Sequence, residues 1–228
     1  MKTVLLTGAT DGLGKALAAE LDKKNYKLVL TGRNQIKMDN LISILNPDNI
    51  ISTHCYDVLN EDDQIKFETY IKDLSFDILI NNAGANLGKS LTINQNIQQH
   101  QDMMNLNCTI PLRLIQTVYP NMKKQQQGKI INILSSCCKY SNINMGAYTA
   151  SKMALEAYTK ILSKEAREDH INVCAIYPGG INTNFRANIR DDYLKPESVA
   201  DAIIKCIELP SEVFIHELVL RPQVEINY

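Results

Sequence analysis

Short, nearly continuous runs of Val, Ile and Leu recur along the chain and alternate with longer segments of mixed polarity. Continuous apolar runs are typical of strands that are buried on both faces of a parallel sheet. The alternation with helix-like segments favours right-handed βαβ crossovers. The pattern therefore predicts an α/β fold, a doubly wound (Rossmann) parallel sheet of about seven strands with helices on both faces. The runs are Val4 to Leu6, Leu28 to Leu30, Ile50 and Ile51, Ile78 to Ile80, Ile130 to Leu134, Val173 to Ile176, and Val213 to Leu220.

Composition adds no sign of a second domain. The 228 residues are 45% hydrophobic and 21% charged, with a formal net charge of −1. The chain has no low-complexity linker and no internal repeat, so we expect one domain over residues 1–228. Lys and Arg form no basic stripe for nucleic acid, and no apolar run approaches the ~20 residues of a membrane span. The apolar N-terminal segment is too short for a secretory signal, so we expect a cytoplasmic protein.

Neither the cysteines nor the histidines have the spacing of a metal site. Cys137 and Cys138 are adjacent and so form no CxxC motif, and no two histidines have HxxxH spacing. We expect no metal, and we expect the six cysteines to be free thiols in a reducing compartment.

A glycine-rich turn follows the first apolar run. Residues 7–14 read TGATDGLG and lead directly into a helix-like segment. Glycines allow a tight turn and a close approach of the backbone, and the N–H groups at a helix N-terminus suit a pyrophosphate. The spacing is not GxGxxG, and an ordinary strand–helix turn that needs glycine has the same composition. Because the turn lies between a strand and a helix, we expect it to form a nucleotide site.

Tyr148 and Lys152 form the second candidate feature. Their spacing places both side chains on one face of a helix. A free tyrosine titrates near pH 10, too high for easy acid/base work, and a neighbouring ammonium lowers that pKa. Tyr119 and Lys123 have the same spacing, so spacing alone does not select the pair. What distinguishes Tyr148 is the strand that precedes it and ends in hydroxyl groups.

Four motifs occur in a fixed order along the chain. They are TGxxxGxG from Thr7, NNAG at residues 81–84, Ser followed by Tyr148-x-x-x-Lys152, and YPG at residues 177–179. In this order the chain resembles the short-chain dehydrogenase/reductase family over residues 1 to about 220. The resemblance implies a single-domain, NADP-preferring carbonyl reductase that transfers a hydride between NADP(H) and a small carbonyl or alcohol substrate. It also implies a homodimer or homotetramer.

The resemblance implies a catalytic set. Tyr148 is the acid in reduction and the base in oxidation, Lys152 lowers its pKa and binds the nicotinamide ribose, and Asn107 supports a proton relay through water. A serine positions the carbonyl oxygen. Ser136 lies 12 residues before Tyr148, and Ser135 has the commoner spacing of 13. We expect Ser136, because the loop after it tolerates a one-residue deletion more easily than the strand end does.

Asn105 is the rival of Asn107, since the two lie on the same predicted helix. Pro111 and Pro120 are expected to bend or segment that helix. Residues 137–140, which read CCKY, are expected to help line the substrate pocket, although loop packing explains them as well. A substrate lid is expected over residues 184–195.

The cofactor contacts that the resemblance implies follow the same motifs. Arg33 comes after the second strand, and no acid precedes Asp39. An acid there would bond the ribose 2′-hydroxyl of NAD, whereas an Arg accommodates the 2′-phosphate, so NADP(H) is favoured over NAD(H). Asp11 counts against a second phosphate. The full expected set is Thr7, Gly8, Gly12, Leu13, Gly14, Arg33, Asp57, Val58, Asn81, Ala83, Gly84, Tyr148, Lys152, Pro178, Gly179, Ile181 and Thr183.

Two other functions fit parts of the sequence. A reductase of carrier-linked 3-oxoacyl substrates would need a basic docking patch, for which Arg186 and Arg190 are candidates, offset by Asp191 and Asp192. A dinucleotide-binding regulatory protein without catalysis would be expected to have a broken Ser-Tyr-Lys set, and here the set is intact.

Overall fold

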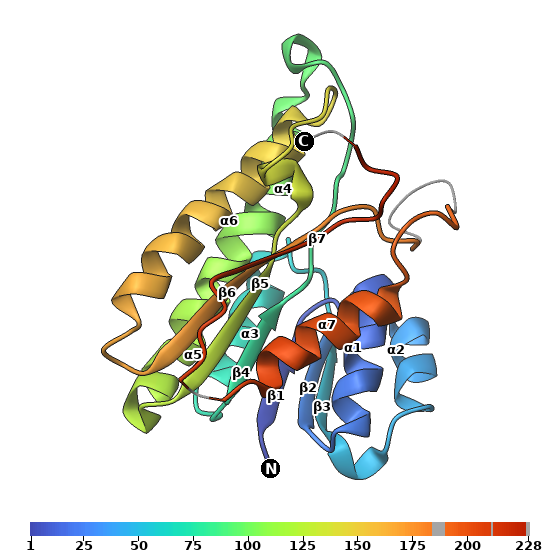
Figure 1. Cartoon of the computed structure of the whole chain (residues 1–228). Helices are drawn as coiled ribbons and strands as arrows, with labels where there is room; N and C mark the ends of the chain where they lie inside the picture. Colours follow the sequence, from blue (N-terminus) through green and yellow to red (C-terminus); the bar gives the residue numbers. More distant parts are fainter. Residues whose placement is uncertain (184–189, 211, 227–228) are drawn as a thin grey trace.

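The computed structural model describes residues 1–183, 190–210 and 212–226. Its centre is a seven-stranded parallel sheet in the order β3-β2-β1-β4-β5-β6-β7 (Figure 1). This order confirms the doubly wound α/β fold. The strands are β1 (Thr3–Leu6), β2 (Lys27–Gly32), β3 (Ile50–Cys55), β4 (Ile78–Asn81), β5 (Gly128–Ile133), β6 (Ile171–Pro178) and β7 (Glu217–Leu220).

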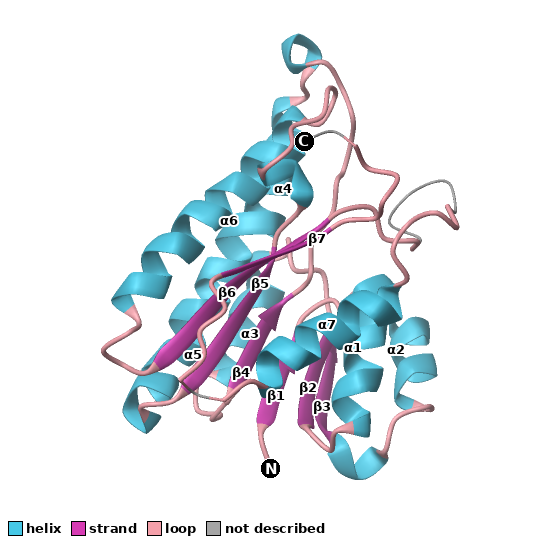
Figure 2. Cartoon of the chain, in the orientation of Figure 1, coloured by secondary structure: helices cyan, strands magenta, loops and turns pink. Residues whose placement is uncertain are grey.

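Helices cover both faces of the sheet (Figure 2). On one face lie α1, α2 and α7, and on the other lie α3, α5 and α6. The helices are α1 (Gly12–Lys23), α2 (Gln35–Ile42), α3 (Glu61–Ile71), α4 (Ile97–Met104), α5 (Ile110–Gln125), α6 (Gly146–Glu165) and α7 (Pro196–Glu208). Short 3-10 turns span Pro47–Asn49, Thr92–Asn94 and Ser136–Cys138.

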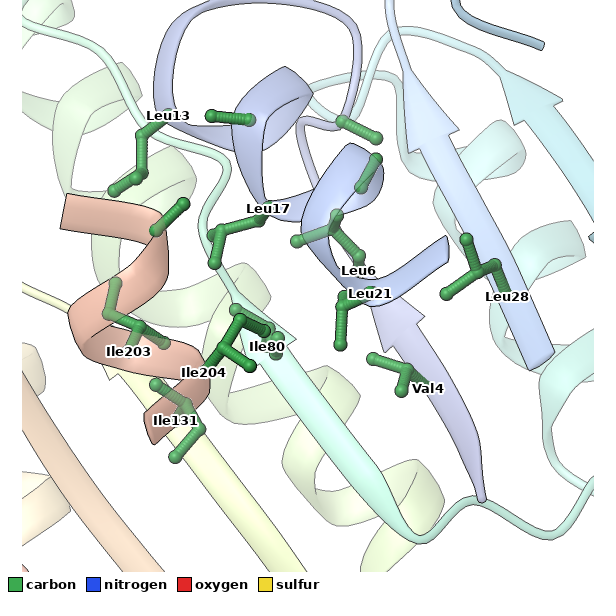
Figure 3. Close-up of a cluster of buried hydrophobic side chains, with 14 of the residues drawn as sticks. Val4, Leu6, Leu13, Leu17, Leu21, Leu28, Ile80, Ile131, Ile203 and Ile204 are labelled. Atoms are coloured by element: carbon green, nitrogen blue, oxygen red, sulfur yellow. The ribbon is translucent and has the colours of Figure 1, made fainter. Parts of the chain in front are cut away.

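Alternation along the central strands explains the continuous apolar runs. Val4 and Leu6 of β1 pack on the α1 and α7 side, and Leu5 between them packs on the α3 and α5 side. All three side chains are fully buried. Successive strand residues point to opposite faces, so a strand covered on both faces has no polar position to alternate with. Figure 3 shows the first of these layers, with Leu17 of α1 and Ile204 of α7 among its members.

Three expectations about elements need correction or detail. β7 begins at Glu217, not at Val213, because the pairing with β6 starts at Ala175 and Glu217. Pro120 lies inside α5 and does not segment it. Pro111 lies at the start of α5, directly after the π-helical turn Asn105–Thr109 that continues from α4, so the helix passes through it without a break.

The cysteines are free thiols, as expected. None of the helices in the described part of the chain is long and apolar enough to span a membrane. Those same residues contain no group of three or more His, Cys, Asp and Glu side chains that could hold a metal ion.

Candidate active site

The predicted site residues gather at the carboxyl edge of the sheet, around the ends of β1, β4, β5 and β6. Thr7, just after β1, connects the first two motifs. Its hydroxyl accepts the N–H groups of Asn82 and Ala83, each at 3.0 Å. In return, the amide Nδ2 of Asn82 donates to the carbonyls of Thr7 at 2.9 Å and Gly8 at 3.1 Å. These bonds fix the glycine turn against the NNAG loop, so Thr7 and Asn82 have a structural role in shaping the edge.

The conformation of the glycine turn requires residues without a side chain. Gly8 and Gly12 have φ values of 64° and 49°, in the left-handed region that favours glycine. A Cβ at Gly14 would collide with the carbonyl oxygen of Gly8. Asp11 caps α1 by accepting the N–H of Gly12 at 2.8 Å. A Cβ at Gly12 would lie 3.1 Å from Cγ2 of Thr183, so the turn and the loop after β6 are in close proximity.

A cation that sequence analysis missed lies beside this turn. Lys37, in the first turn of α2, forms an ion pair with Asp11. The pair neutralises the carboxylate that seemed to oppose a second phosphate. Arg33, directly after β2, is exposed and has no hydrogen bond or ion pair with the residues that the structure describes. In the sequence Lys37 lies only four residues after Arg33, but its pairing with Asp11 depends on the fold.

The ends of β3 and β4 supply the next group. Asp57 is exposed, and its Oδ1 accepts the N–H of Leu59 at 3.0 Å. Val58 lines a narrow cavity together with Thr31, Asn81 and Ala83, among others. Asn81 is buried, donates from Nδ2 to Oδ1 of Asn132 at 2.9 Å, and has an Oδ1 without a hydrogen-bond partner. A buried acceptor without a partner is rare and fits a polar ligand at this edge.

Tyr148 and Lys152 are both buried on α6, with 7% and 4% of their surfaces exposed. The ammonium of Lys152 donates to the carbonyl of Ile133, the last residue of β5, at 2.8 Å. Burial lowers the pKa of Lys152 to about 8, although the nearby thiols of Cys138, Cys137 and Cys108 oppose that shift. The comparison pair, Tyr119 and Lys123, instead binds the Asp169 carboxylate at 2.6 and 3.2 Å.

Asn107 lies where a π-helical turn, Asn105–Thr109, joins α4 to α5. Its Oδ1 accepts the N–H of Ala85 at 3.0 Å, and its Nδ2 donates to the Ala85 carbonyl at 2.9 Å and to Ser151 at 3.0 Å. A Cβ at Gly84 would lie 2.7 Å from this Oδ1 and 3.1 Å from Nζ of Lys152. Asn107 is fully buried beside Lys152, whereas Asn105 is exposed. Short π-helical turns occur often at functional sites.

The two candidate serines have different surroundings. Ser135 precedes the 3-10 turn, and its hydroxyl accepts the N–H of Cys137 at 3.2 Å. It also contacts the Cys137 thiol, which binds Thr149 and lies near Lys152. Cys137 is buried and packs against Tyr148. Ser136 is the first residue of the turn, and its carbonyl accepts the N–H of Lys139 at 3.0 Å. The described contacts therefore connect Ser135 to the helix of Tyr148.

An ion network centred on the buried Glu156 holds the 3-10 turn Ser136–Cys138, here called the serine turn, to α6. Lys139 donates to Glu156 at 3.0 Å and to Glu217 of β7 at 2.9 Å. Glu156 also accepts from Lys160 at 2.7 Å and from the Tyr177 hydroxyl at 3.0 Å. Burial alone would raise the pKa of Glu156, but these hydrogen bonds lower it. Lys139, expected at the pocket wall, is thus engaged in packing the loop.

The loop after β6 is covered from one side by residues of the expected lid. Leu194 donates its N–H to the Gly180 carbonyl at 3.0 Å, and Leu194 forms a bridge with Ile181. A Cβ at Gly180 would lie 2.5 Å from the Tyr193 ring. Residues 190–195 of the expected lid thus return to the loop that carries Pro178, Gly179, Ile181 and Thr183. Residues 184–189 lie outside the described part of the chain.

The family model described as short chain dehydrogenase matches residues 2–194. The chain belongs to the short-chain dehydrogenase family. It is accordingly an NAD(P)-dependent oxidoreductase. An uncharacterized oxidoreductase of Staphylococcus epidermidis is 30% identical over 226 residues, which are 97% of each chain. An uncharacterized oxidoreductase of Staphylococcus aureus is also 30% identical over 226 residues, again 97% of each chain.

Solved structures of short-chain enzymes resemble this chain over nearly its whole length. The closed form of a serine dehydrogenase in complex with NADP⁺ superposes with a TM-score of 0.87 at 26% identity, covering 96% of this chain and 94% of that one. Serine dehydrogenase from Escherichia coli gives 0.85 at 27% identity, covering 96% and 97%. A short-chain dehydrogenase from Sphingobium yanoikuyae in complex with NADPH gives 0.85 at 26% identity, covering 99% and 89%.

Proposed function

We propose that this protein is an NADP(H)-dependent reductase of small carbonyl compounds, and that Tyr148 and Lys152 are its catalytic pair. The observation that carries the proposal is the environment of Lys152. It is a buried ammonium, one helical turn from Tyr148, with Asn107 and the backbone of Gly84 beside it. Burying a cation is costly unless it is paired and hydrogen-bonded. Buried groups whose pKa is strongly shifted concentrate at functional sites.

The glycine turn and the NNAG loop fit a dinucleotide. Gly14 approaches the Gly8 carbonyl too closely for any side chain. Asn81, whose Oδ1 has no hydrogen-bond partner among the described residues, lines the cavity together with Val58 and Ala83. Bound NADP(H) supplies the hydride in reduction and accepts it in oxidation. The residues of the chain hold the dinucleotide and the substrate in contact and move the proton.

In reduction, the Tyr148 hydroxyl donates a proton to the carbonyl oxygen of the substrate as that oxygen gains negative charge. The ammonium of Lys152 stabilises the phenolate that results. Asn107 fixes the Ala85 backbone through two hydrogen bonds and so shapes the space next to Lys152. In oxidation, the phenolate removes the proton from the substrate alcohol.

The substrate oxygen also needs a hydroxyl donor at the end of β5. Sequence position favoured Ser136. The contacts favour Ser135, because its Oγ already accepts the Cys137 N–H and lies next to a thiol that packs on Tyr148. A hydroxyl that accepts from the backbone can donate its own proton, and an oxyanion would take that proton in place of the Cys137 sulfur that Ser135 contacts. We therefore propose Ser135 as the donor and keep Ser136 as the alternative that the variants below test.

Two cations support the preference for NADP(H) over NAD(H). Arg33 is exposed after β2, and Lys37 is held nearby by its ion pair with Asp11. Arg33 is the cation that would pair with a 2′-phosphate, and Lys37 offsets the negative charge of Asp11 that would repel it. Two of the relatives compared above, at 26% identity, are complexes with NADP⁺ or NADPH.

The first experiment is calorimetric titration of the purified protein with NADPH and with NADH. Preference for NADPH supports the proposal, and absence of binding by either dinucleotide contradicts it. A panel of aldehydes, ketones and hydroxy acids then follows, with loss or gain of nicotinamide absorbance as the signal. Serine belongs in this panel, because two of the structures compared above are serine dehydrogenases.

The carrier-linked alternative finds no support in Arg190. Its guanidinium pairs with Asp192 and stacks on the Tyr193 ring at 4.4 Å. The positive charge of Arg190 is therefore already neutralised by Asp192 and offers little attraction to an acidic carrier. The other candidate, Arg186, lies outside the described residues.

A further inference from the structure

The chain after β7 lies against two loops of the candidate active site. The N–H of Gly179 donates to the carbonyl of Leu220, the last residue of β7, at 2.7 Å. A turn follows, in which Glu225 donates its N–H to the Pro222 carbonyl at 3.1 Å. Figure 1 shows this part of the chain in red, running on from β7 past the carboxyl end of the sheet. We call residues 221–225 the C-terminal turn.

The carboxylate of Glu225 is hydrogen-bonded to the loop after β6. Its Oε1 accepts the backbone N–H of Gly180 at 2.7 Å, and its Oε2 accepts from Nε of Arg221 at 3.2 Å. A Cβ at Gly179 would collide with Oε2 and would lie 3.0 Å from Cδ of Pro222. The Glu225 side chain is only 17% exposed. A charge-assisted bond to a backbone N–H in a mostly buried position is among the stronger hydrogen bonds in proteins.

Arg221 anchors the C-terminal turn to the other loop. Its guanidinium lies over the ring of Tyr140, 4.1 Å from the centroid, and its side chain is 11% exposed. Tyr140 belongs to the loop that follows the serine turn and donates its N–H to the carbonyl of Ser136 at 2.8 Å. The C-terminal turn therefore connects the loop after β5 with the loop after β6, the two loops that flank the site of hydride transfer.

We infer that Glu225 is a positioning residue that fixes the Gly179–Gly180 backbone for the nicotinamide half of the cofactor, and that Arg221 holds Glu225 in place. This rests on the proposed function. Without the carboxylate, the loop occupies its binding-competent conformation for a smaller fraction of the time, and apparent affinity falls by that fraction. Only ligands that reach this loop are affected.

The test compares NADPH with 2′,5′-ADP, which contains the adenosine and the 2′-phosphate but lacks the nicotinamide. Glu225→Ala is expected to raise the Kd for NADPH roughly tenfold, as loss of a charge-assisted hydrogen bond predicts. The Kd for 2′,5′-ADP is expected to stay within about twofold, because that ligand binds far from Gly180. Glu225→Gln keeps a neutral acceptor and is expected to lie between Glu225→Ala and the wild type.

The matched control is Glu208→Gln, which removes a carboxylate that pairs with Lys24 on the surface, at 2.9 Å. It is expected to bind both ligands as the wild type does. An equal loss of both ligands in the Glu225 variants would show a purely structural role and overturn the inference, as would unchanged NADPH binding. A wild-type protein that binds no NADPH would instead overturn the proposed function itself.

Discussion

Lys152 and Ile133 are joined by a hydrogen bond of 2.8 Å from the ammonium to the backbone carbonyl at the end of β5. This bond places a cation at the carboxyl edge of the sheet, although its side chain originates on a helix that covers one face. It also leaves the remaining two N–H groups of the ammonium available for other acceptors. The proposed roles of Lys152, towards Tyr148 and towards the nicotinamide ribose, need such donors.

Replacing Tyr148 by Phe removes the proposed proton donor and keeps the ring, which belongs to the same buried cluster as Cys137 and Met103. We expect turnover to fall by about 10²- to 10⁴-fold, the usual contribution of general acid catalysis. NADPH binding and thermal stability should stay close to those of the wild type. Steady-state kinetics with the best carbonyl substrate checks this. Tyr119→Phe, the same substitution at a tyrosine outside the site, is the control. Turnover near the wild-type level would remove Tyr148 from the mechanism.

The serine variants separate the two candidates. We expect Ser135→Ala to lower kcat by about 10²-fold, because an oxyanion donor is lost. Ser136→Ala should have a much smaller effect. Parallel kinetics on both variants decides the assignment. A larger loss in Ser136→Ala would return the role to the serine that sequence position favoured.

Cofactor preference should depend on both cations. Arg33→Ala and Lys37→Ala are each expected to weaken NADPH binding by about tenfold or more while leaving NADH nearly unchanged, because only NADPH presents a 2′-phosphate. Titration calorimetry with both dinucleotides measures the ratio. Lys66→Ala, which removes an exposed lysine paired with Asp63 on α3, is the control. If NADH weakened as much as NADPH in either variant, that cation would have no role in selecting the phosphate.

The lowered pKa of Lys152 predicts a pH-dependent stability. Burial shifts this pKa from 10.5 to about 8 in the folded protein. Between these values the unfolded chain binds the extra proton, so the contribution of Lys152 to the free energy of unfolding rises with pH. Below pH 8 both states are protonated and the destabilising effect of the buried charge is complete.

The measurement is denaturant unfolding of the wild type and of Lys152→Met from pH 7 to pH 10.5. The stability of the wild type relative to the variant should increase across this range, by on the order of 3 kcal/mol. A constant difference would mean that Lys152 titrates normally in the folded protein. Lys164→Met, which replaces an exposed lysine in the last turn of the same helix, controls for loss of a charge.

The fold could be predicted from the sequence because buried parallel strands have a distinctive pattern. The pattern failed at Val213 and Phe214, which are apolar and yet lie partly exposed before β7. At these two residues hydrophobicity indicated neither burial nor hydrogen-bond pairing, and the pairing with β6 begins only at Glu217. The expectation that Pro120 would bend or segment its helix also failed to include tertiary packing. Residues of α5 are buried on both sides of Pro120, and this packing offsets the loss of one backbone hydrogen bond.

The site could be predicted only in part. The structure brings Asn107 to Lys152 and leaves Asn105 exposed, which no spacing rule could decide. The ion pair of Asp11 with Lys37 and the bond from Gly180 to Glu225 join residues far apart in the chain. Such contacts form where loops from different strands come together at one edge of the sheet. Local sequence patterns do not indicate which residues of these loops will be in contact.

The network around Glu156 has a consequence for how this sequence can change over time. Glu156 is almost fully buried, and its charge is balanced by Lys139 from the serine turn and by Lys160. Losing one cation leaves this buried carboxylate less well neutralised, at a cost below the ~3–5 kcal/mol of breaking a fully buried pair, because both lysines are partly exposed. Lys139 also pairs with Glu217 of β7. Positions 139, 156 and 217 are therefore expected to mutate together among related chains, and an alignment of such chains would show this as covariation of position 139 with the other two.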